Sequence, residues 1–308
     1  MTCKKCGFQI AESAKSCQEC GSSITNECDD CGNALPASAK FCSACGASQT
    51  SSREPMFPTD EKTEDNNDQE VRALIERGLE YNDLGQHELA IQDFNKAIRL
   101  NPQNAMAYNS RGIAYARQGQ HELAIQDISE AIRLNPQDAM AYSSSSIAYA
   151  SLDQHEPTIQ DYDEAIRLNQ QDARAYLDRG IAYARQSQHE RAIQDYDEAI
   201  RLNPQNAMAY YNRGGAYNNL GQHERAIQDY DDAIRLNPQD ARAYLGMGAV
   251  YTRLGQYEQA IQGYDEAIRL NPQDGVTYLA RGAAYASLGK GVESERDIRK
   301  AKELGYSP

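Results

Sequence analysis

Eight cysteines are the residues of this chain whose type and spacing indicate chemistry. They form four Cys-x2-Cys pairs, and a pattern of two pairs separated by ten residues occurs twice. Each pair can place two thiolates on one side of a metal ion, and two pairs complete a tetrahedral shell of four sulfurs. Such a shell suits zinc and leaves no position for a catalytic water, so we expect two structural zinc ions. The expected ligands are Cys3, Cys6, Cys17 and Cys20 for one ion and Cys28, Cys31, Cys42 and Cys45 for the other.

The two halves of this cysteine-rich segment also match outside the cysteines. Ala14-Lys15-Ser16-Cys17 corresponds to Ala39-Lys40-Phe41-Cys42, and residues 1–46 resemble a double zinc ribbon. Interleaved pairing of the ligands between the two sites stays open, and iron or a redox-active dithiol is the alternative to zinc. Because the segment is short and has few large apolar side chains, zinc binding would supply its folding free energy, on the order of 10–16 kcal/mol in model fingers.

The charge of the chain disfavours nucleic acid as a partner. The 308 residues carry a formal net charge of -14, whereas phosphate binding requires clustered Lys and Arg. No apolar run approaches the roughly 20 residues of a membrane helix, and the N-terminus lacks the apolar stretch of a secretory signal. We therefore expect a cytoplasmic protein without a membrane span, in which the thiols stay reduced.

Residues 47–70 are predicted to form a disordered acidic linker. This segment contains prolines at positions 55 and 58, many Ser, Thr, Asn and Asp residues, and little that could be buried. We expect it to tether the cysteine-rich segment to the rest of the chain.

Residues 71–308 consist of seven blocks of 34 residues that align without a gap. In every block position eight is Gly or Ser, position eleven is Tyr, and position twenty-seven is Ala. Small and large residues at helical spacing let two helices pack closely, so each block predicts a helix-turn-helix unit. The blocks are 71–104, 105–138, 139–172, 173–206, 207–240, 241–274 and 275–308.

The expected helix ends follow the same period. Asn or Asp precedes each first helix from the second block on, glycine closes most first helices, and Asn-Pro ends most second helices. These blocks resemble tetratricopeptide repeats, with Tyr at position four where that family usually has Trp. The resemblance implies an all-α, right-handed superhelical solenoid of seven helix-turn-helix repeats that binds other proteins.

Two features set individual repeats apart. Arg at position seven and Asp at position twenty-three occur together in five repeats, which predicts an ion pair between the two helices of a repeat. The third repeat instead has four serines, residues 143–146, at the centre of its first helix. We expect this repeat to be a soft point of the superhelix, that is, a segment that opens locally more easily than its neighbours.

The resemblance further implies that the first helices line a concave groove, at positions two, five, nine, twelve and thirteen. The residues at these positions combine Met, aromatic and Arg side chains, which suit an extended or helical peptide with acidic groups. The alternative is that Arg recurs there only as a soluble helix former. The expected partner-binding residues are Arg72, Met106, Asn109, Arg117, Met140, Arg174, Leu177, Arg185, Met208, Tyr211, Asn219, Arg242, Leu245 and Arg253.

The repeats show no sequence signature of catalysis. The five histidines all stand at position seventeen, and equivalent positions of stacked repeats are roughly 10 Å apart, too far to share one metal ion. We therefore predict a non-enzymatic protein-protein interaction adaptor or scaffold that binds a partner protein or peptide, acidic ones included, in the groove. The alternative is a nucleic-acid-associated regulator in which the zinc ribbon contacts the polyanion. Self-association through the ends of the array stays open.

Overall fold

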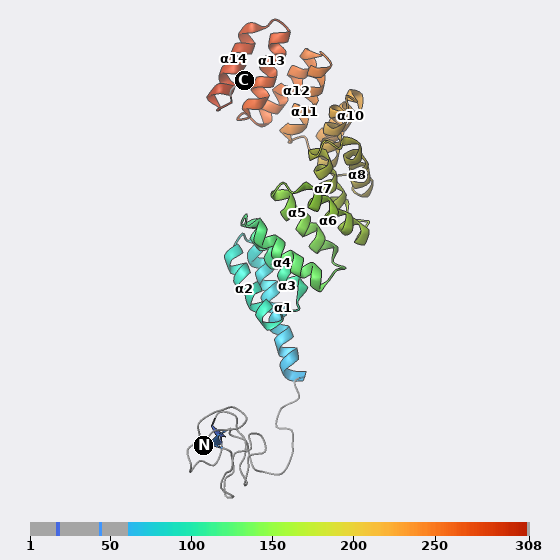
Figure 1. Ribbon diagram of the computed structural model, residues 1–308. Coiled ribbons are helices and arrows are strands. Elements are labelled where there is room, and N and C mark those ends of the chain that lie inside the picture. Colours follow the sequence, from blue (N-terminus) through green and yellow to red (C-terminus); the bar gives the residue numbers. More distant parts are fainter. Residues whose placement is uncertain (1–16, 19–42, 45–60, 307–308) are drawn as a thin grey trace. The chain divides into compact units, whose positions relative to one another are not determined.

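The computed structural model describes residues 17–18, 43–44 and 61–306, and it divides the chain into two units, Met1–Asp65 and Asn66–Pro308 (Figure 1). In the first unit, β1 (Cys17–Gln18) pairs in parallel with β2 (Ser43–Ala44), with Cys17 opposite Ser43. The two strands come from corresponding parts of the two cysteine-rich halves, which therefore pair with each other. The seven other cysteines expected to bind zinc lie outside the described residues.

The second unit is an all-α, right-handed solenoid of seven helix pairs, as predicted (Figure 1). Each repeat contributes a first and a second helix that pack side by side. The fourteen helices of the described residues are α1 (Glu61–Asp83), α2 (His87–Leu100), α3 (Ala105–Arg117), α4 (His121–Leu134), α5 (Ala139–Ser151), α6 (His155–Leu168), α7 (Ala173–Arg185), α8 (His189–Leu202), α9 (Ala207–Asn219), α10 (His223–Leu236), α11 (Ala241–Arg253), α12 (Tyr257–Leu270), α13 (Gly275–Ser287) and α14 (Gly291–Glu303).

The predicted helix ends are confirmed. The side chains of Asn104, Asp138, Asp172, Asn206, Asp240 and Asp274 accept hydrogen bonds from backbone N–H groups in the first turn of the helix that follows. At the turn between the two helices the backbone is left-handed, and glycine fills this position in five repeats. The third and fourth repeats have Asp153 and Ser187 there, with φ of 55° and 59°.

The close contact within each repeat depends on the small residue at position eight. A Cβ atom on Gly180 would lie 2.6 Å from Cε1 of Tyr196, which is fully enclosed in the core. The third repeat has Ser146 at this position, and its hydroxyl donates to the carbonyl of Tyr142 in the preceding turn. At Gly214 and Gly282 the nearest neighbour of such a Cβ atom would lie 3.3 Å away, so the approach of the two helices differs between repeats.

The structure shortens the predicted linker. Helix α1 begins at Glu61, so residues 61–70 are helical rather than disordered, and residues 47–60 lie outside the described residues. The amide of Asn67 donates to the carbonyl of Leu100 at 3.2 Å, which attaches this extension to the end of α2.

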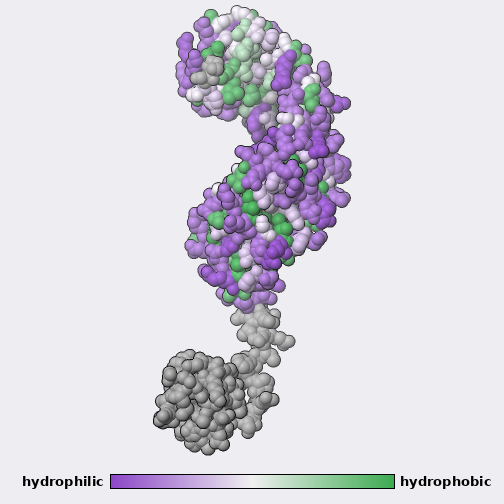
Figure 2. All heavy atoms as spheres, in the orientation of Figure 1, coloured by the Kyte–Doolittle hydropathy of each residue, from purple (hydrophilic) through white to green (hydrophobic). Residues whose placement is uncertain are grey.

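The first helices form the inner layer of the solenoid because they contact one another across repeats. Such contacts join α3 to α5, α7 to α9, α9 to α11 and α11 to α13. Helices α5 and α7 approach each other less closely than these four pairs do. The face of the repeats seen in Figure 2 is mostly hydrophilic, with hydrophobic side chains in separate patches.

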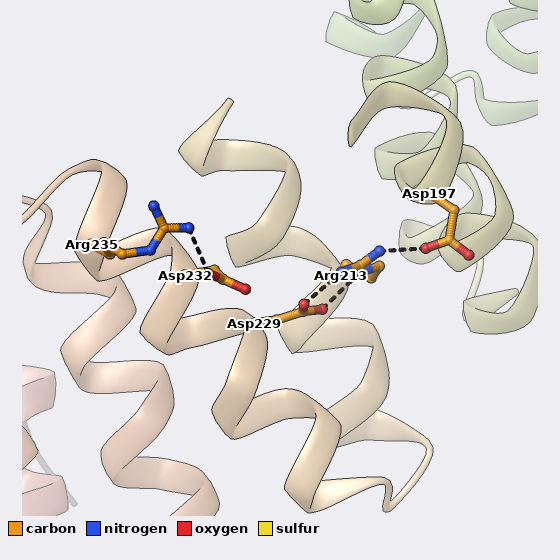
Figure 3. A network of polar contacts seen from close by, with 5 residues as sticks. All are labelled: Asp197, Arg213, Asp229, Asp232 and Arg235. Carbon is orange, nitrogen blue, oxygen red and sulfur yellow. Dashed lines mark hydrogen bonds and ion pairs between the residues drawn. The ribbon is translucent and has the colours of Figure 1, made fainter. Parts of the chain in front are cut away.

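Arginine at position seven connects three helices, and the Arg–Asp pair predicted for five repeats is confirmed in all five. Arg213 on α9 donates two hydrogen bonds, of 2.8 and 2.7 Å, to Asp229 on α10 of the same repeat (Figure 3). Its third nitrogen donates to Asp197 on α8 of the preceding repeat at 2.5 Å (Figure 3). This third contact, which sequence analysis missed, joins neighbouring repeats. We call the resulting line of contacts the arginine seam.

The arginine seam has the same geometry wherever its residues are present. The arginine also lies over the tyrosines at positions four and eleven, with its guanidinium carbon 5.5–6.0 Å from their ring centroids. Complete sets that reach the preceding repeat are Asn95–Arg111–Asp127, Asp163–Arg179–Asp195, Asp197–Arg213–Asp229 and Asp265–Arg281–Asp297.

The seam is interrupted in the third and sixth repeats in different ways. In the sixth repeat Met247 packs on the apolar core and Gly263 replaces the aspartate, so no buried carboxylate is left at that position. In the third repeat Ser145 replaces the arginine while Asp161 stays, and Oδ2 of Asp161 is buried without a hydrogen-bond partner. Burial raises the pKa of Asp161, as it does for Asp195 and Asp229, but these two also have an arginine hydrogen bond that opposes the shift.

We expect Ser145→Arg to stabilise the solenoid by about 1–2 kcal/mol, because the new guanidinium would pair with the unpartnered carboxylate of Asp161. The flanking tyrosines that hold the arginine in other repeats are present as Tyr142 and Tyr149. The free energy of unfolding from denaturant titration measures the gain. In an Asp161→Asn background the same substitution should give little or none, and an equal gain in both backgrounds would contradict the assignment.

The pH dependence of stability provides a separate test. Because the folded-state pKa of Asp161 is raised, the folded state binds the proton more tightly than the unfolded chain, whose Asp pKa is about 3.9. The contribution of Asp161 to stability therefore falls as pH rises through the interval between these two pKa values. We expect Asp161→Asn to be more stable than the unaltered chain at pH 7 and to lose this advantage on acidification below that interval, as followed by thermal unfolding. A stability difference that does not change with pH would contradict the shifted pKa.

Candidate functional site

Two adjoining hollows lie on the inner face of the third repeat. The larger, of about 590 Å³, is bounded by side chains of α3, α5 and α7, together with residues from the second helices. The smaller, of about 340 Å³, lies between α5, α6 and α7. The residues that line both are Ile147, Ser151, Tyr162, Arg174 and Asp178. We call the two together the inner hollow.

The walls of the inner hollow are mainly apolar. Ile113, Ala116 and Met140 line the larger part, and Ile181 and Ala182 line the smaller part. Met140 and Ile147 keep 68% and 41% of their surface exposed, so the hollow presents free apolar surface. Burying such surface against a ligand is favourable.

Charged groups stand around these apolar walls. Arg174 faces Asp178 at 3.5 Å, and burial raises the pKa of Asp178 although Arg174 opposes this shift. Arg185 is exposed, and it makes no hydrogen bond or ion pair within the described part of the chain. The arrangement provides an apolar surface with cationic groups at its margin, which suits binding rather than bond cleavage.

Comparison with known families agrees with this architecture. Tetratricopeptide repeat families match residues 78–119, 105–138, 159–207, 177–241 and 241–274, and the double zinc ribbon family matches residues 3–46. The chain is a tetratricopeptide repeat protein with an N-terminal double zinc ribbon. Proteins with such repeats are generally non-enzymatic scaffolds.

Solved tetratricopeptide repeat proteins share the fold. A tetratricopeptide repeat protein from Parabacteroides merdae is 21% identical, with a TM-score of 0.62, over 77% of this chain and 94% of that one. YrrB, described as a TPR protein with an unusual peptide-binding site, is 21% identical, with a TM-score of 0.52, over 60% and 95%. MamA from Desulfovibrio magneticus RS-1 is 24% identical, with a TM-score of 0.51, over 54% and 94%. No curated protein matches the chain.

The structure places most of the expected groove residues of this tetratricopeptide repeat array on the surface. Arg117, Met140 and Arg174 line the larger part of the inner hollow, and Arg174 and Arg185 line the smaller part. The remaining exposed or half-buried residues stand elsewhere along the array: Arg72, Met106, Met208, Tyr211, Asn219, Arg242, Leu245 and Arg253.

Two of the expected partner-binding residues are wrong. Asn109 and Leu177, both at position five, are only 5% exposed. Leu177 packs with Ala192 and Tyr196 in the core of the fourth repeat. A side chain at position five is buried between neighbouring helices when it fits into the space there. Asn109 and Leu177 are buried in this way, so neither residue can contact a partner.

Some of the remaining cationic residues are already engaged. Arg117 donates to the carbonyl of Asn82 at 2.8 Å, in the last turn of α1. Arg242 pairs with Asp240 and lies over the ring of Tyr211. Among the expected arginines of the inner face, Arg72, Arg185 and Arg253 have no ion pair or hydrogen bond within the described residues. They are the arginines best placed to receive a carboxylate from a partner.

The histidines stand at or next to the first turns of the second helices, and two of them border the inner hollow. His121 lines the larger part and His155 the smaller part. Residues 67–306 contain no group of three or more His, Cys, Asp or Glu side chains that could hold a metal ion. None of the helices in the described residues combines the length and hydropathy required to cross a membrane.

The residues that sequence analysis missed are Ser143, Ser144, Ile147, Tyr162 and Asp178, all of which line the inner hollow. The run of four serines marked the right repeat, but it indicated weak packing rather than a binding surface. The hollow is open because position five of the third repeat has the small side chain of Ser143. This can be recognised only from the positions of the three helices around it, α3, α5 and α7.

Proposed function

We propose that this protein is a non-enzymatic adaptor or scaffold, located in the cytoplasm, that binds a segment of a partner protein on the inner face of its repeats. The observation that carries the proposal is the inner hollow, an apolar surface with Arg174 and Arg185 at its margin. Apolar side chains with adaptable Met and bidentate Arg suit a peptide that carries acidic groups. The peptide-binding site named for YrrB supports the same use of the fold.

The double zinc ribbon adds a second module to this proposal. Zinc would be held by the eight cysteines in two sites of four thiolates, one formed by Cys3, Cys6, Cys17 and Cys20. A shell closed by four thiolates supports the fold of the module and takes no part in catalysis. The division of the chain into two units supports a separate role for each module.

The proposal predicts that neutralising Arg185 and Arg253 weakens partner binding. Both are exposed residues of first helices, and a carboxylate that pairs with one of them contributes about tenfold in affinity. The measurement is a quantitative pull-down from host lysate with the full chain, followed by titration of the partners it identifies. We expect Arg185→Gln/Arg253→Gln to lose affinity for at least one major partner by about tenfold or more.

The matched control is Arg201→Gln/Arg269→Gln, which changes the net charge equally. These arginines stand on second helices and pair only with Glu198 and Glu266 in the same helix. We expect this variant to retain its partners. Equal loss, or equal retention, in the two double variants would place binding outside the inner face.

For the zinc module, we expect the chain purified under reducing conditions to contain two zinc ions. Cys17→Ser should remove about one ion, and Cys17→Ser/Cys42→Ser should remove both, because each substitution opens one four-thiolate shell. Elemental analysis measures the metal, and thermal unfolding followed by circular dichroism should show unchanged melting of the helical array. Iron in place of zinc, or full zinc content in the double variant, would contradict the assignment.

A further inference from the structure

We propose that the inner hollow is a pocket for one large apolar side chain, Leu, Met or Phe, of the partner peptide, and that Arg174 and Arg185 bind a carboxylate a few residues away in the same peptide. This inference rests on the proposed function and names the chemistry of its ligand. It follows from the difference between the third repeat and the others.

Position five of the first helix explains why the hollow exists at this repeat. Later repeats fill this position with a large side chain of their own, and Leu177 in the fourth repeat is 5% exposed. The third repeat has Ser143 at the same position, and Ser143 lines the larger part of the hollow. The other large residues at this position are Ile75, Tyr211, Leu245 and Leu279. The third repeat thus lacks the apolar side chain that the fold accommodates elsewhere.

The surroundings of Ser143 suit an apolar group from outside. Ile113, Met140 and Ile147 form the walls, and Met140 and Ile147 are exposed without a ligand. The wider separation of α5 and α7 keeps the space open between neighbouring first helices. A volume of about 590 Å³ exceeds that of one side chain, so the hollow can also receive the adjoining backbone of a peptide.

The hydroxyl of Ser143 favours a peptide as the ligand. Its Oγ is buried and has no hydrogen-bond partner, which is costly for a polar group. After rotation of its side chain into the hollow, this hydroxyl can pair with a peptide bond next to the apolar anchor, which supplies both a donor and an acceptor. A purely hydrocarbon ligand would leave it unpaired.

The charges at the margin favour an acidic residue beside the anchor. Arg174 contacts Asp178 only at 3.5 Å, its side chain is 79% exposed, and its guanidinium makes no hydrogen bond within the described residues. Arg185 borders the same smaller part of the hollow. Asp178 also lines it, and its carboxylate faces Arg174 at 3.5 Å, which offsets part of its repulsion of a bound carboxylate. The two arginines therefore outweigh one aspartate.

The test uses a random library of 12-residue displayed peptides, selected on the full chain. We expect enriched peptides to carry a large apolar residue with Asp or Glu within about four positions, the span that bridges the hollow and its margin. Binding of the enriched peptides is then measured on Ser143→Leu, which places the chain's own leucine in the hollow as Leu177 does in the next repeat. We expect affinity to fall about tenfold or more, as expected when a buried apolar contact is lost.

Two further variants separate the parts of the site. Ser143→Ala keeps the hollow open and should retain binding within a few-fold, losing only a single hydrogen bond. Arg174→Gln/Arg185→Gln should bind the enriched peptides more weakly and remove their preference for acidic residues. Melting temperatures check that each variant is folded, and Ser143→Leu should melt at or above the temperature of the unaltered chain.

The outcomes distinguish this inference from the proposed function. If peptides are enriched but bind Ser143→Leu as tightly as the unaltered chain, the inner face binds peptides and the pocket assignment is wrong. If they lack an apolar residue or an acidic one, the proposed ligand chemistry is wrong. If no peptide is enriched on the unaltered chain, the peptide-binding function fails and this inference fails with it.

Discussion

The arginine at position seven is the interaction on which the regular stacking of this solenoid depends. Apolar packing between helices is repeated along the array and permits small sliding, whereas a planar guanidinium shared by two carboxylates accepts only a narrow range of geometries. Arg179, for example, donates to Asp195 in its own repeat and to Asp163 in the preceding one. Each complete set thus fixes both the angle within a repeat and the position of the next repeat, on which the curvature of the inner face depends.

The four serines of the third repeat replace two residues that most other repeats use, the arginine at position seven and the large side chain at position five. Ser145 takes the arginine out of the seam and leaves the Asp161 carboxylate buried without its partner, while Ser143 takes the apolar side chain out of the inner face. The sixth repeat also lacks the arginine, but there Met247 packs on the core and Gly263 leaves no buried carboxylate unpaired. The third repeat thus combines a missing Arg–Asp pair with the inner hollow. Recognition sites often lie in such less stable segments.

Much of the fold could be predicted from the sequence because its signals are local or strictly periodic. The caps at Asn104 and Asp138 and the Arg179–Asp195 pair all follow from residues at fixed positions of a repeat. The start of α1 at Glu61 could not be predicted, because a polar segment carries no periodic apolar signal. The segment is attached by one hydrogen bond, from Asn67 to the carbonyl of Leu100. The burial of Leu177 and the hollow over Ser143 could not either, since both depend on how closely neighbouring helices approach. The acceptors in the preceding repeat recur at position twenty-five, a period that could have been found by comparing adjacent repeats.

Hydrogen exchange of the full chain, followed by mass spectrometry, tests most directly whether the buried carboxylate of Asp161, left without its arginine, destabilises the third repeat. Local opening exposes amides according to the stability of each segment, so equivalent helices can be compared within one molecule. We expect amides of α5 and α6 to exchange about tenfold faster than those of α7 and α8, and amides of α11 and α12 to be protected like α7 and α8. Equal protection of the third and fourth repeats would contradict the account, as would exchange in the sixth repeat as fast as in the third.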